Sequence, residues 1–555
     1  MAKAQTIEAG HGKDGVEARI RDLLSQMSVE EKVGQLNQVE GSAHDVVHAL
    51  GADLRAGQIG SVINQVDPAT VNELQRIARE ESRLGIPLLI GRDVIHGFKT
   101  VAPIPLGQAA TWNPDLVEAC ARMAGEEASA VGVNWTFAPM IDICRDPRWG
   151  RIAESLGEDP VLTSILGAAM VRGFQGETLS DPTSLAACAK HFAGYGASEA
   201  GRDYNTTNLP ENELRNVHLP PFRAAAEAGA ASLMTSFSDI DGIPATANTL
   251  LLRDVLRGEW DYDGMVVSDW DAIKQLCTHG LTETEYEAAY QAATAGVDMD
   301  MVASAYRNHL ADLIACGRIE LAVLDRMVAN VLRMKFRLGL FDGRTTADAE
   351  PSRMASRSLV KQAALQSCVL LKNDDHTIPL DPAALTRLAV IGPLADDPVE
   401  QLGTWIFDGD PERSVTPLAA IKTLAADTAL SLHHVRALAT TRSHDQSGFD
   451  EAEAAARDAD AVLVFLGEEA ILSGEAHCRA DIDLPGAQVE LVKRLKATGK
   501  PVIAVIQAGR PLTLASVIDH LDALLFAWHP GSLGGAAIAD LLFGRACPSG
   551  KLPVS

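Results

Sequence analysis

The chain has 555 residues, of which 47% are hydrophobic and 22% charged, and its formal net charge is −26 at pH 7. This length predicts two or three domains, and the composition is that of a folded globular protein, which excludes disordered and fibrous classes. The acidic balance argues against binding to nucleic acid or to an anionic membrane, because both need clustered Lys and Arg, whereas a neutral substrate is unaffected.

The N-terminus and the cysteines bear on the cellular compartment. Residues 1–15 contain no apolar run of signal-peptide length, and no stretch approaches the roughly 18 apolar residues of a membrane span. The eight cysteines are scattered and form no CxxC pair, which predicts free and mostly buried thiols. These features favour a cytoplasmic protein, and a periplasmic protein whose leader was replaced by Met1 is the alternative.

The first 340 or so residues alternate short β-rich runs with helical patterns such as PDLVEACARMAGEEASAVG. The runs are GIPLLIG (85–91), NWTFAPMID (134–142), LAACAKHF (185–192), ASLMTSF (231–237), GMVVSD (264–269) and GVDMDM (296–301). Such alternation predicts βαβ units with a parallel sheet, and this many units in succession predict a closed (β/α)₈ barrel.

Charged side chains stand at the C-terminal ends of several of these runs. They are Asp93, Asp142, Arg145, Lys190, His191 and Asp269. A single charge at a strand end is ordinary in a solvated loop. Their succession predicts a site at the edge where a (β/α)₈ barrel carries its active site.

A second α/β region follows the barrel pattern. A helical pattern at 321–341 is followed by DGRTTADAEPS (342–352), which has the turn formers and charge of a linker, and by a helix predicted at 353–372. Four apolar runs separated by helices then predict an open, mostly parallel sheet covered on both faces, at 387–393, 460–468, 501–509 and 523–531.

The expected division of the chain has three parts. We expect a TIM-like barrel domain at 1–343, a linker and connecting helix at 344–372, and an α/β sandwich domain at 373–555. The sandwich domain is expected to stop short at its C-terminal end.

No motif for a metal or an organic cofactor is present, so we expect neither. There is no GxGxxG after a strand, no HExxH and no metal-type Cys/His spacing, and FGRACPSGKL has the wrong spacing for a phosphate loop.

Carboxylates therefore remain as the candidate chemistry. Glycoside hydrolysis needs an ionised carboxylate on one side of the scissile bond and a protonated carboxyl on the other. Asp269 ends a predicted strand beside Trp270, and an indole stacks well on the apolar face of a sugar. An N-cap aspartate beside a core tryptophan explains the same residues equally well. Glu475, in the loop 473–485, is by itself one surface glutamate among many.

Eight sequence segments favour the catalytic interpretation of Asp269 and Glu475 over the structural one. They are GRDVIHG (91–97), FAPMIDICRDPRWGRIAESLGEDP (137–160), CAKHFAGYGA (188–197), LLRDVLRGEWDYDGMVVSDWDA (251–272), KFRLGLFD (335–342), VLLKNDDHTIPL (369–380), ILSGEAHCRADIDLP (471–485) and FGRACPSGKLP (543–553). In this order they resemble glycoside hydrolase family 3, the β-glucosidase and β-xylosidase family, and within it the bacterial β-glucosidases of the periplasmic type. RDPRWGR and the SDW string are specific, and the resemblance covers the chain from about Val29.

The resemblance implies a barrel followed by an α/β sandwich, and a retaining, exo-acting glycosidase that removes non-reducing-end β-D-glucose by double displacement. It implies that Asp269 is the nucleophile and that Glu475 is the acid/base, with the two carboxyl groups about 5–5.5 Å apart. The loop that carries the acid/base varies across the family, which leaves Glu468 and Glu469 as competitors.

The resemblance also implies a set of substrate-binding residues. Besides Trp270 at the stacking position, hydroxyl groups of the sugar are expected to bind Asp93, Arg151, Lys190 and His191. A buried ionic scaffold beneath the site is expected from Arg145, Asp146, Arg148 and Glu154.

The chain departs from the family's pattern in three places. Phe237-Ser238 stands where many relatives have Tyr-Asn, which removes a phenol near Asp269. The chain stops at KLPVS (551–555), where relatives continue into a fibronectin-like domain, so we expect a short form or a cut sequence. The stretch 190–205 lacks the Asp-His pair of the N-acetylglucosaminidase branch, which argues against that activity.

Several alternatives stay open at this point. The enzyme could be a transglycosylase or a β-xylosidase, or the chain could be a non-catalytic carbohydrate-binding protein. WIFDGDPERS (405–414) is expected either to border the leaving-group subsite or to form a surface loop. The expected partner is a small carbohydrate, and a homodimer is left open.

Overall fold

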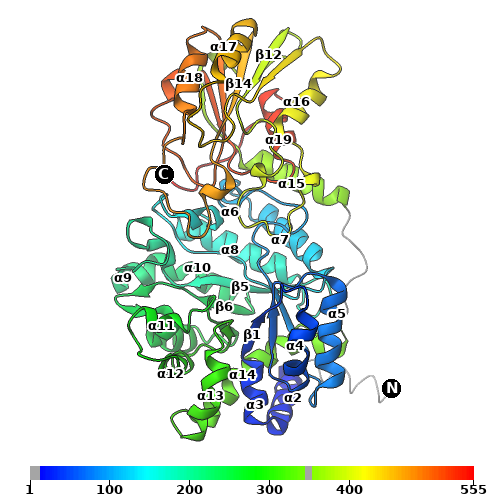
Figure 1. The fold of residues 1–555 in the computed structure, drawn as a ribbon, viewed down its shortest axis with the longest axis vertical. Coiled ribbons are helices and arrows are strands. Elements are labelled where there is room, and N and C mark those ends of the chain that lie inside the picture. The colour runs from blue at the N-terminus through cyan, green and yellow to red at the C-terminus, as the bar shows by residue number, and fades with distance from the viewer. Residues whose placement is uncertain (1–12, 344–352) are drawn as a thin grey trace.

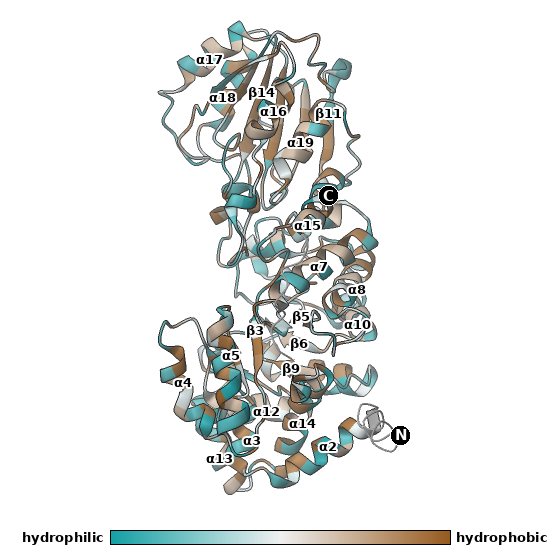
Figure 2. Cartoon of the chain, turned by 90° about the vertical axis from the view of Figure 1, so that its right-hand side faces the viewer, coloured by the Kyte–Doolittle hydropathy of each residue, from teal (hydrophilic) through white to brown (hydrophobic). Residues whose placement is uncertain are grey.

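The computed structural model describes residues 13–343 and 353–555, which form two α/β domains stacked along the long axis of the molecule (Figure 1). In both domains hydrophobic residues gather on many of the inner strands, and the helices around them carry hydrophilic outer faces (Figure 2). Among the described residues, no helix combines the length and the apolarity needed to cross a bilayer.

The first domain is a parallel eight-stranded barrel with strand order β10-β1-β2-β3-β4-β5-β6-β9. A parallel bridge between Val267 and Met299 joins β9 to the segment that leads into β10, so the sheet nearly closes on itself. The strands are β1 Asn37–Glu40, β2 Ser61–Ile63, β3 Leu89–Arg92, β4 Trp135–Thr136, β5 Ala186–Phe192, β6 Ser232–Thr235, β9 Met265–Val267 and β10 Asp300–Met301. The predicted barrel is confirmed, although β1 and β2 were not among the predicted runs.

Helices surround this barrel, and several begin with a proline that follows an Asp or Asn cap. Asp67, Asn113 and Asp159 each accept a backbone N–H at the start of α5, α7 and α8, which satisfies donors that a helix terminus leaves free. The helices are α2 Lys13–Gln26, α3 Val29–Gln35, α4 Val46–Arg55, α5 Pro68–Arg76, α6 Pro105–Ala110, α7 Pro114–Ser129, α8 Pro160–Gln175, α9 Glu211–Glu213, α10 Leu219–Glu227, α11 Gln275–Thr278, α12 Glu285–Ala295, α13 Ala305–Ala315 and α14 Leu321–Arg337. Three π-helical segments, η1 Ile77–Glu81, η5 Leu214–His218 and η7 Leu250–Glu259, and a short hairpin of β7 Asp239–Ile240 with β8 Ile243–Pro244 complete the domain.

The second domain is a six-stranded sheet with strand order β11-β16-β15-β14-β12-β13, in which only β11 runs antiparallel to its neighbour. The strands are β11 Val369–Asn373, β12 Arg387–Ile391, β13 Ser431–Val435, β14 Ala461–Gly467, β15 Val502–Gln507 and β16 Ala523–Phe526. The helices are α15 Arg353–Ser367, α16 Pro417–Ala425, α17 Phe449–Asp458, α18 Gln488–Lys496 and α19 Gly534–Leu542. The predicted mostly parallel sheet is therefore confirmed.

Both faces of this sheet are buried, as the apolar runs predicted. Because successive side chains of a strand point to opposite faces, Val462 and Val464 of β14 pack into one hydrophobic cluster, whereas Leu463 and Phe465 pack into the other. Helices α17 and α18 contribute to the first cluster, and α16 and α19 to the second.

The boundaries between the parts differ from the prediction in one respect. The helix predicted at 353–372 ends at Ser367, because Val369–Asn373 forms β11 at the edge of the second sheet. The linker at 344–352 lies outside the described residues, and the exact division of the chain at 343 and 372 stays a prediction.

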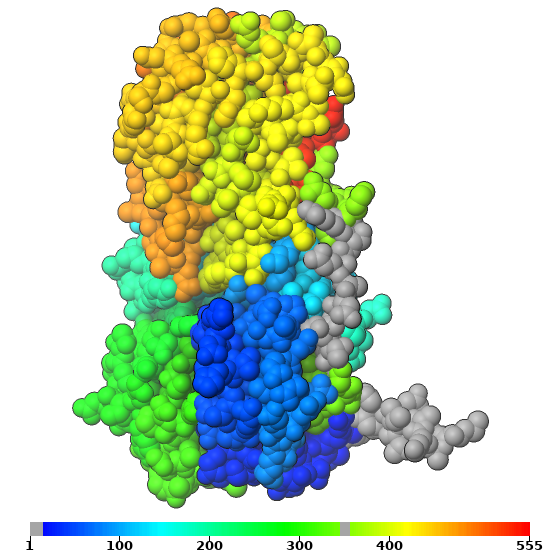
Figure 3. Space-filling view, turned by 45° about the vertical axis from the view of Figure 1, so that its right-hand side comes forward, coloured from blue at the N-terminus to red at the C-terminus, as the bar shows by residue number. Residues whose placement is uncertain are grey.

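The two domains share one hydrophobic cluster. Trp149 and Ile152, from the C-terminal edge of the barrel, belong to the same buried cluster as Val464 and Trp528 of the second domain. Figure 3 shows the yellow and orange surface of the second domain lying directly on the blue and cyan surface of the barrel. The second domain therefore covers the edge of the barrel where the polar strand ends lie.

All eight cysteines are free, as predicted. The expectation that most are buried holds for only half of them, since Cys277 is partly exposed and Cys316, Cys478 and Cys547 are exposed. These four lie in loops or at helix ends, where sequence hydropathy says little about burial.

Candidate active site

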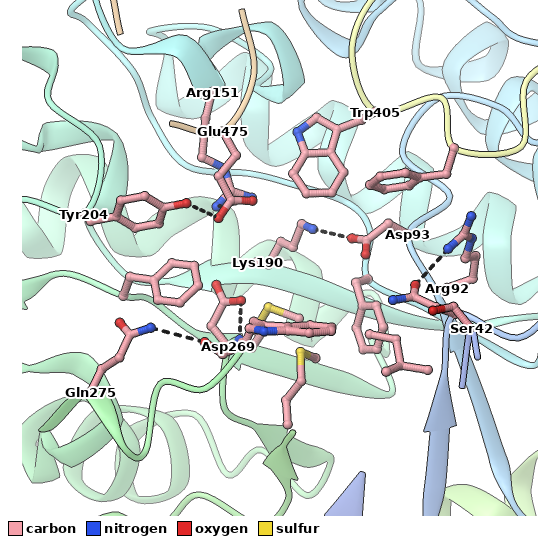
Figure 4. Close-up of a pocket in the computed structure, with 18 residues that line it drawn as sticks. Ser42, Arg92, Asp93, Arg151, Lys190, Tyr204, Asp269, Gln275, Trp405 and Glu475 are labelled. Carbon is pink, nitrogen blue, oxygen red and sulfur yellow. Dashed lines mark hydrogen bonds and ion pairs between the residues drawn. The ribbon is translucent and has the colours of Figure 1, made fainter. Parts of the chain in front are cut away.

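A cavity of about 650 Å³ lies between the C-terminal edge of the barrel and the second domain (Figure 4). Six of the seven predicted site residues line it: Asp93, Arg151, Lys190, Asp269, Trp270 and Glu475. His191 is fully buried and does not line it. The structure thus brings together residues that stand more than 380 positions apart in the chain.

Asp269 projects into the cavity two residues beyond the end of β9. Its Oδ1 accepts the backbone N–H of Trp270 at 2.7 Å, whereas its Oδ2 is buried without a hydrogen-bond partner among the described residues. Burial raises the pKa of Asp269 to about 7, and the positive charge of Arg151 opposes this rise. One carboxylate oxygen is thus anchored and the other is left for a reacting group.

A buried chain of polar groups lies behind Asp269. Asp142 accepts both the backbone N–H and the Nδ1 of His191 at 2.9 Å, and the Nε2 of His191 lies 2.9 Å from Nη2 of Arg151. A guanidinium only donates, so Nε2 must accept and the imidazole is neutral with its proton on Nδ1. Burial, with the charges of Arg151 and Lys190, holds the pKa of His191 well below its ordinary value. His191 therefore orients Arg151 from behind and lies 3.6 Å from Oδ2 of Asp269, rather than facing the cavity.

Beside Asp269, Lys190 and Asp93 form an ion pair with Nζ and Oδ1 2.7 Å apart (Figure 4). The ammonium also lies 5.0 Å from the centre of the Trp405 ring, and the indole Nε1 of Trp405 is buried without a hydrogen-bond partner among the described residues. A carboxylate, an ammonium and a free indole N–H together suit a ligand rich in hydroxyl groups.

Trp405 and Phe407 belong to residues 405–414, which were expected either to border the leaving-group subsite or to form a surface loop. Both side chains line the cavity. Arg92 holds this stretch to the barrel, because its Nε lies 2.8 Å from Oδ2 of Asp408 and its guanidinium stacks over the Phe407 ring at 4.9 Å. The stretch therefore borders the cavity.

Glu475 enters the cavity from the second domain, on the loop after the short helical turn Ala470–Leu472. The hydroxyl of Tyr204 donates to its Oε1 at 2.6 Å, and Nη1 of Arg151 lies 3.7 Å from its Oε2 (Figure 4). Tyr204 lies in a barrel loop and had no signal in the sequence analysis, because nothing local tells a surface tyrosine from one that meets another domain.

The two competitors of Glu475 are engaged elsewhere. Glu468 is fully buried between Arg479 and Arg510, and Glu469 accepts from Thr441 at 2.7 Å and from Arg442 at 2.9 Å. Neither of the two glutamates lines the cavity. This geometry favours Glu475 as the acid/base candidate.

The expectation of a buried ionic scaffold is wrong for three of its four members. Glu154 is buried and holds Nε of Arg151 at 2.6 Å, as expected. Arg145 is exposed and 3.4 Å from Glu213, while Asp146 and Arg148 pair with each other in a half-buried loop. The loop borders the domain junction at the surface, where ion pairs remain solvated and contribute little.

Arg510 was not singled out by the sequence, yet it joins the loop of Glu475 to the barrel. Its buried guanidinium donates to the carbonyl oxygens of Pro147 at 2.7 Å and Arg148 at 3.0 Å in the barrel, and to that of His477 at 2.9 Å in the second domain. Its Nε lies 3.1 Å from Oε1 of Glu468.

Across residues 13–343 and 353–555, no group of three or more His, Cys, Asp or Glu side chains could hold a metal ion.

Comparison with known proteins agrees with this architecture. Residues 28–334 match the glycosyl hydrolase family 3 N terminal domain, and residues 368–555 match the glycosyl hydrolase family 3 C-terminal domain. A periplasmic beta-glucosidase of Salmonella typhimurium is 39% identical over 97% of this chain and 74% of its own length. A beta-xylosidase of Formosa agariphila is 35% identical over 90% of this chain and 73% of its own length.

A solved structure shows the same fold. The beta-glucosidase from Listeria innocua in complex with glucose superposes with a TM-score of 0.91 at 37% identity, covering 97% of this chain and 76% of that one. The matches to both domains and these identities over nearly the whole chain show that the protein belongs to glycoside hydrolase family 3.

Proposed function

We propose that the protein is a retaining, exo-acting β-glycosidase that removes β-D-glucose from the non-reducing end of oligosaccharides or glucosides. One observation carries the proposal: Asp269 of the barrel and Glu475 of the second domain line one cavity that also contains the hydroxyl-binding candidates Asp93 and Lys190. Two carboxyl groups that face a cavity large enough for a sugar are what double displacement requires.

In the first step, the unpartnered Oδ2 of Asp269 attacks the anomeric carbon. The bond between that carbon and the leaving oxygen breaks, and the protonated carboxyl of Glu475 gives its proton to the leaving oxygen. Arg151 lies close to Glu475 and its charge acts on both carboxyl groups, so it stabilises the carboxylate that forms on Glu475.

In the second step, Glu475 takes a proton from a water molecule, which attacks the glycosyl-enzyme and releases Asp269. The sugar leaves with the β configuration restored. No step in this sequence uses a metal ion or an organic cofactor.

Sugar preference divides the relatives, since both a β-glucosidase and a β-xylosidase are among them. Glucose is favoured because the Listeria innocua beta-glucosidase structures were obtained with glucose and with laminaribiose. The β-xylosidase activity is the second candidate. Transglycosylation is the third, because it shares the glycosyl-enzyme and differs only in the acceptor.

The test is release of p-nitrophenol from matched β-glucoside and β-xyloside substrates. We expect faster release from the glucoside, and loss of activity on the order of 10⁴-fold in Asp269→Asn. Asp271→Asn is the matched control, because Asp271 does not line the cavity and its φ of 58° suits asparagine. Wild-type activity in Asp269→Asn would end the assignment, and longer oligosaccharides in place of free glucose would identify a transglycosylase.

The compartment and the oligomeric state stay predictions. The Salmonella typhimurium relative is named periplasmic, which favours the periplasmic alternative over a cytoplasmic location. A homodimer is tested by light scattering of the purified protein.

A further inference from the structure

A short barrel loop, residues 199–206, reaches the loop of the second domain that carries Glu475. Two residues of this barrel loop have backbone conformations that side-chain-bearing residues rarely adopt, Ala200 with φ of 57° and Tyr204 with φ of 62°. Ala476, directly after Glu475, has φ of 61°. Such conformations persist only where surrounding contacts hold them, and they concentrate at functional sites.

Asp203 contacts two of these three residues, Tyr204 and Ala476, through its side chain. Its Oδ2 accepts the backbone N–H of Ala476 at 2.7 Å, and its Oδ1 accepts the indole N–H of Trp149 at 2.9 Å. Its own backbone N–H donates to Sγ of Cys478 at 3.0 Å. The carboxylate of Asp203 therefore bridges a fully buried tryptophan of the barrel and the peptide that follows Glu475.

The next residue, Tyr204, holds the carboxyl group itself. Its hydroxyl donates to Oε1 of Glu475 at 2.6 Å, while its ring packs edge-on against Phe237 with ring centres 5.2 Å apart. Backbone and side chain of Glu475 are thus both held by consecutive residues of one barrel loop.

We propose that Asp203 is a positioning residue that places Glu475 for proton transfer, acting through the backbone of Ala476, with Tyr204 orienting the carboxyl group. The inference rests on the proposed function, because it assumes that Glu475 is the acid/base. The charged acceptor makes the bond to Ala476 stronger than one between neutral groups, and a displacement of about 1 Å costs a catalytic group up to roughly 100-fold in rate.

This role has a specific kinetic signature. Proton donation limits the first step only when the leaving group is a poor one, whereas a strongly activated phenolate departs without it. A loop that merely supports the fold would affect both kinds of substrate equally. The ratio of kcat/KM between the two substrates therefore separates positioning of the acid from general stability.

The experiment compares phenyl and 2,4-dinitrophenyl β-glycosides of the sugar that the wild-type enzyme cleaves. We expect Asp203→Ala to lower kcat/KM for the phenyl glycoside about 30- to 100-fold and for the dinitrophenyl glycoside less than about threefold. Asp203→Asn, which keeps one acceptor oxygen for Ala476, should recover part of the loss. Glu199→Gln is the matched control, because Glu199 is an exposed carboxylate of the same loop and its side chain accepts a hydrogen bond from Asn208.

Equal losses on both substrates, or no loss on either, would overturn the role of Asp203. If Asp203→Ala fails to fold, Tyr204→Phe removes only a hydroxyl and is expected to give the same selective loss at about tenfold. Failure of the proposed function would give a different result. If Glu475 is not the acid/base, Glu475→Gln would lower kcat/KM equally for the phenyl and the dinitrophenyl glycoside, or not at all. If Glu475→Gln loses more activity on the phenyl glycoside than on the dinitrophenyl glycoside but the Asp203 and Tyr204 variants do not, the positioning role is overturned and the proposed function stands.

Discussion

Gly474 of the second domain donates its backbone N–H to the carbonyl oxygen of Gly150 in the barrel at 2.8 Å. The two glycines adjoin Glu475 and Arg151, so this bond joins the loop of the proposed acid/base to the turn that carries its cationic neighbour. A Cβ atom on Gly150 would lie 2.2 Å from the oxygen of Gly474 and 2.5 Å from that of His477. The backbones of the two domains are therefore in direct contact at this point.

Gly150→Ala tests that junction. Because both opposing atoms are backbone oxygens, the added methyl group cannot be accommodated by a side-chain rotation and must push the loop of Glu475 away. We expect kcat for a phenyl glycoside to fall about 10- to 100-fold, since small displacements of catalytic groups are costly. Gly258→Ala is the control, because a Cβ atom there would lie 3.3 Å from the carbonyl oxygen of Arg253 and contact no other atom more closely. This variant should retain activity. Unchanged kinetics in Gly150→Ala would show that the junction tolerates movement.

Removing the charge of Arg510 tests the contribution of this residue to the same domain interface. Replacing it with methionine leaves Glu468 with one fewer cation and removes the donor that the carbonyl oxygens of Pro147 and His477 share across the domain junction. We expect the free energy of unfolding to fall by about 2–5 kcal/mol, measured by urea denaturation. Arg494→Met, which removes an ion-paired arginine on the surface of α18, should change stability little. Equal effects of the two substitutions would contradict a special role for Arg510.

The raised pKa of Asp269 predicts a dependence of stability on pH. In the folded protein, burial raises this pKa to about 7 from an ordinary value of 3.8. Between these two values the unfolded chain has released the proton and the folded chain retains it, so the stability contributed by this group is present below pH 4 and is lost as the pH rises to 7. Asn does not titrate, so Asp269→Asn should gain stability relative to wild type by about 2–4 kcal/mol over this range.

Urea unfolding of both proteins at pH 4.0, 5.5 and 7.5 measures this difference. A difference that stays constant, or one that shrinks as the pH rises, would show that the pKa of Asp269 is not raised in the folded protein.

The assignment of the acid/base is tested by paired substitutions of two neighbouring glutamates. Glu475→Gln removes a proton donor that lines the cavity and should lower kcat/KM for a phenyl glycoside about 10²- to 10⁴-fold. Glu469→Gln changes a carboxylate that is bound to Thr441 and Arg442, outside the cavity, and should leave activity close to wild type. The reverse pattern would assign the role to Glu469.

Much of the fold was predictable because it is encoded in local patterns. The apolar runs of β14 and β15 indicate strands buried on both faces, and the alternation of such runs with helices indicates parallel sheets. The pattern fails for β1, whose sequence NQVE is polar although Asn37 and Gln38 are fully buried within the barrel. It also fails for β13, an edge strand whose residues SLHHV are mostly accessible.

The candidate site divides in the same way. The position of Asp269 at the edge of the barrel could be predicted from the sequence, because it lies just beyond a buried strand and the carboxyl ends of barrel strands meet at one edge, whereas its role as the nucleophile came only from the family resemblance. The contacts of Asp203 and Tyr204 with the loop of Glu475 could not be predicted, since the bond from Ala476 to Asp203 spans 273 positions and that from Tyr204 to Glu475 spans 271. The sequence by itself determined the two sheets and the residues at their edges, because periodicity and strand ends are local properties. Only the tertiary structure decided which side chains share the cavity with Asp269 and what holds the loop of Glu475 there, because those contacts arise when two separately encoded domains pack against each other.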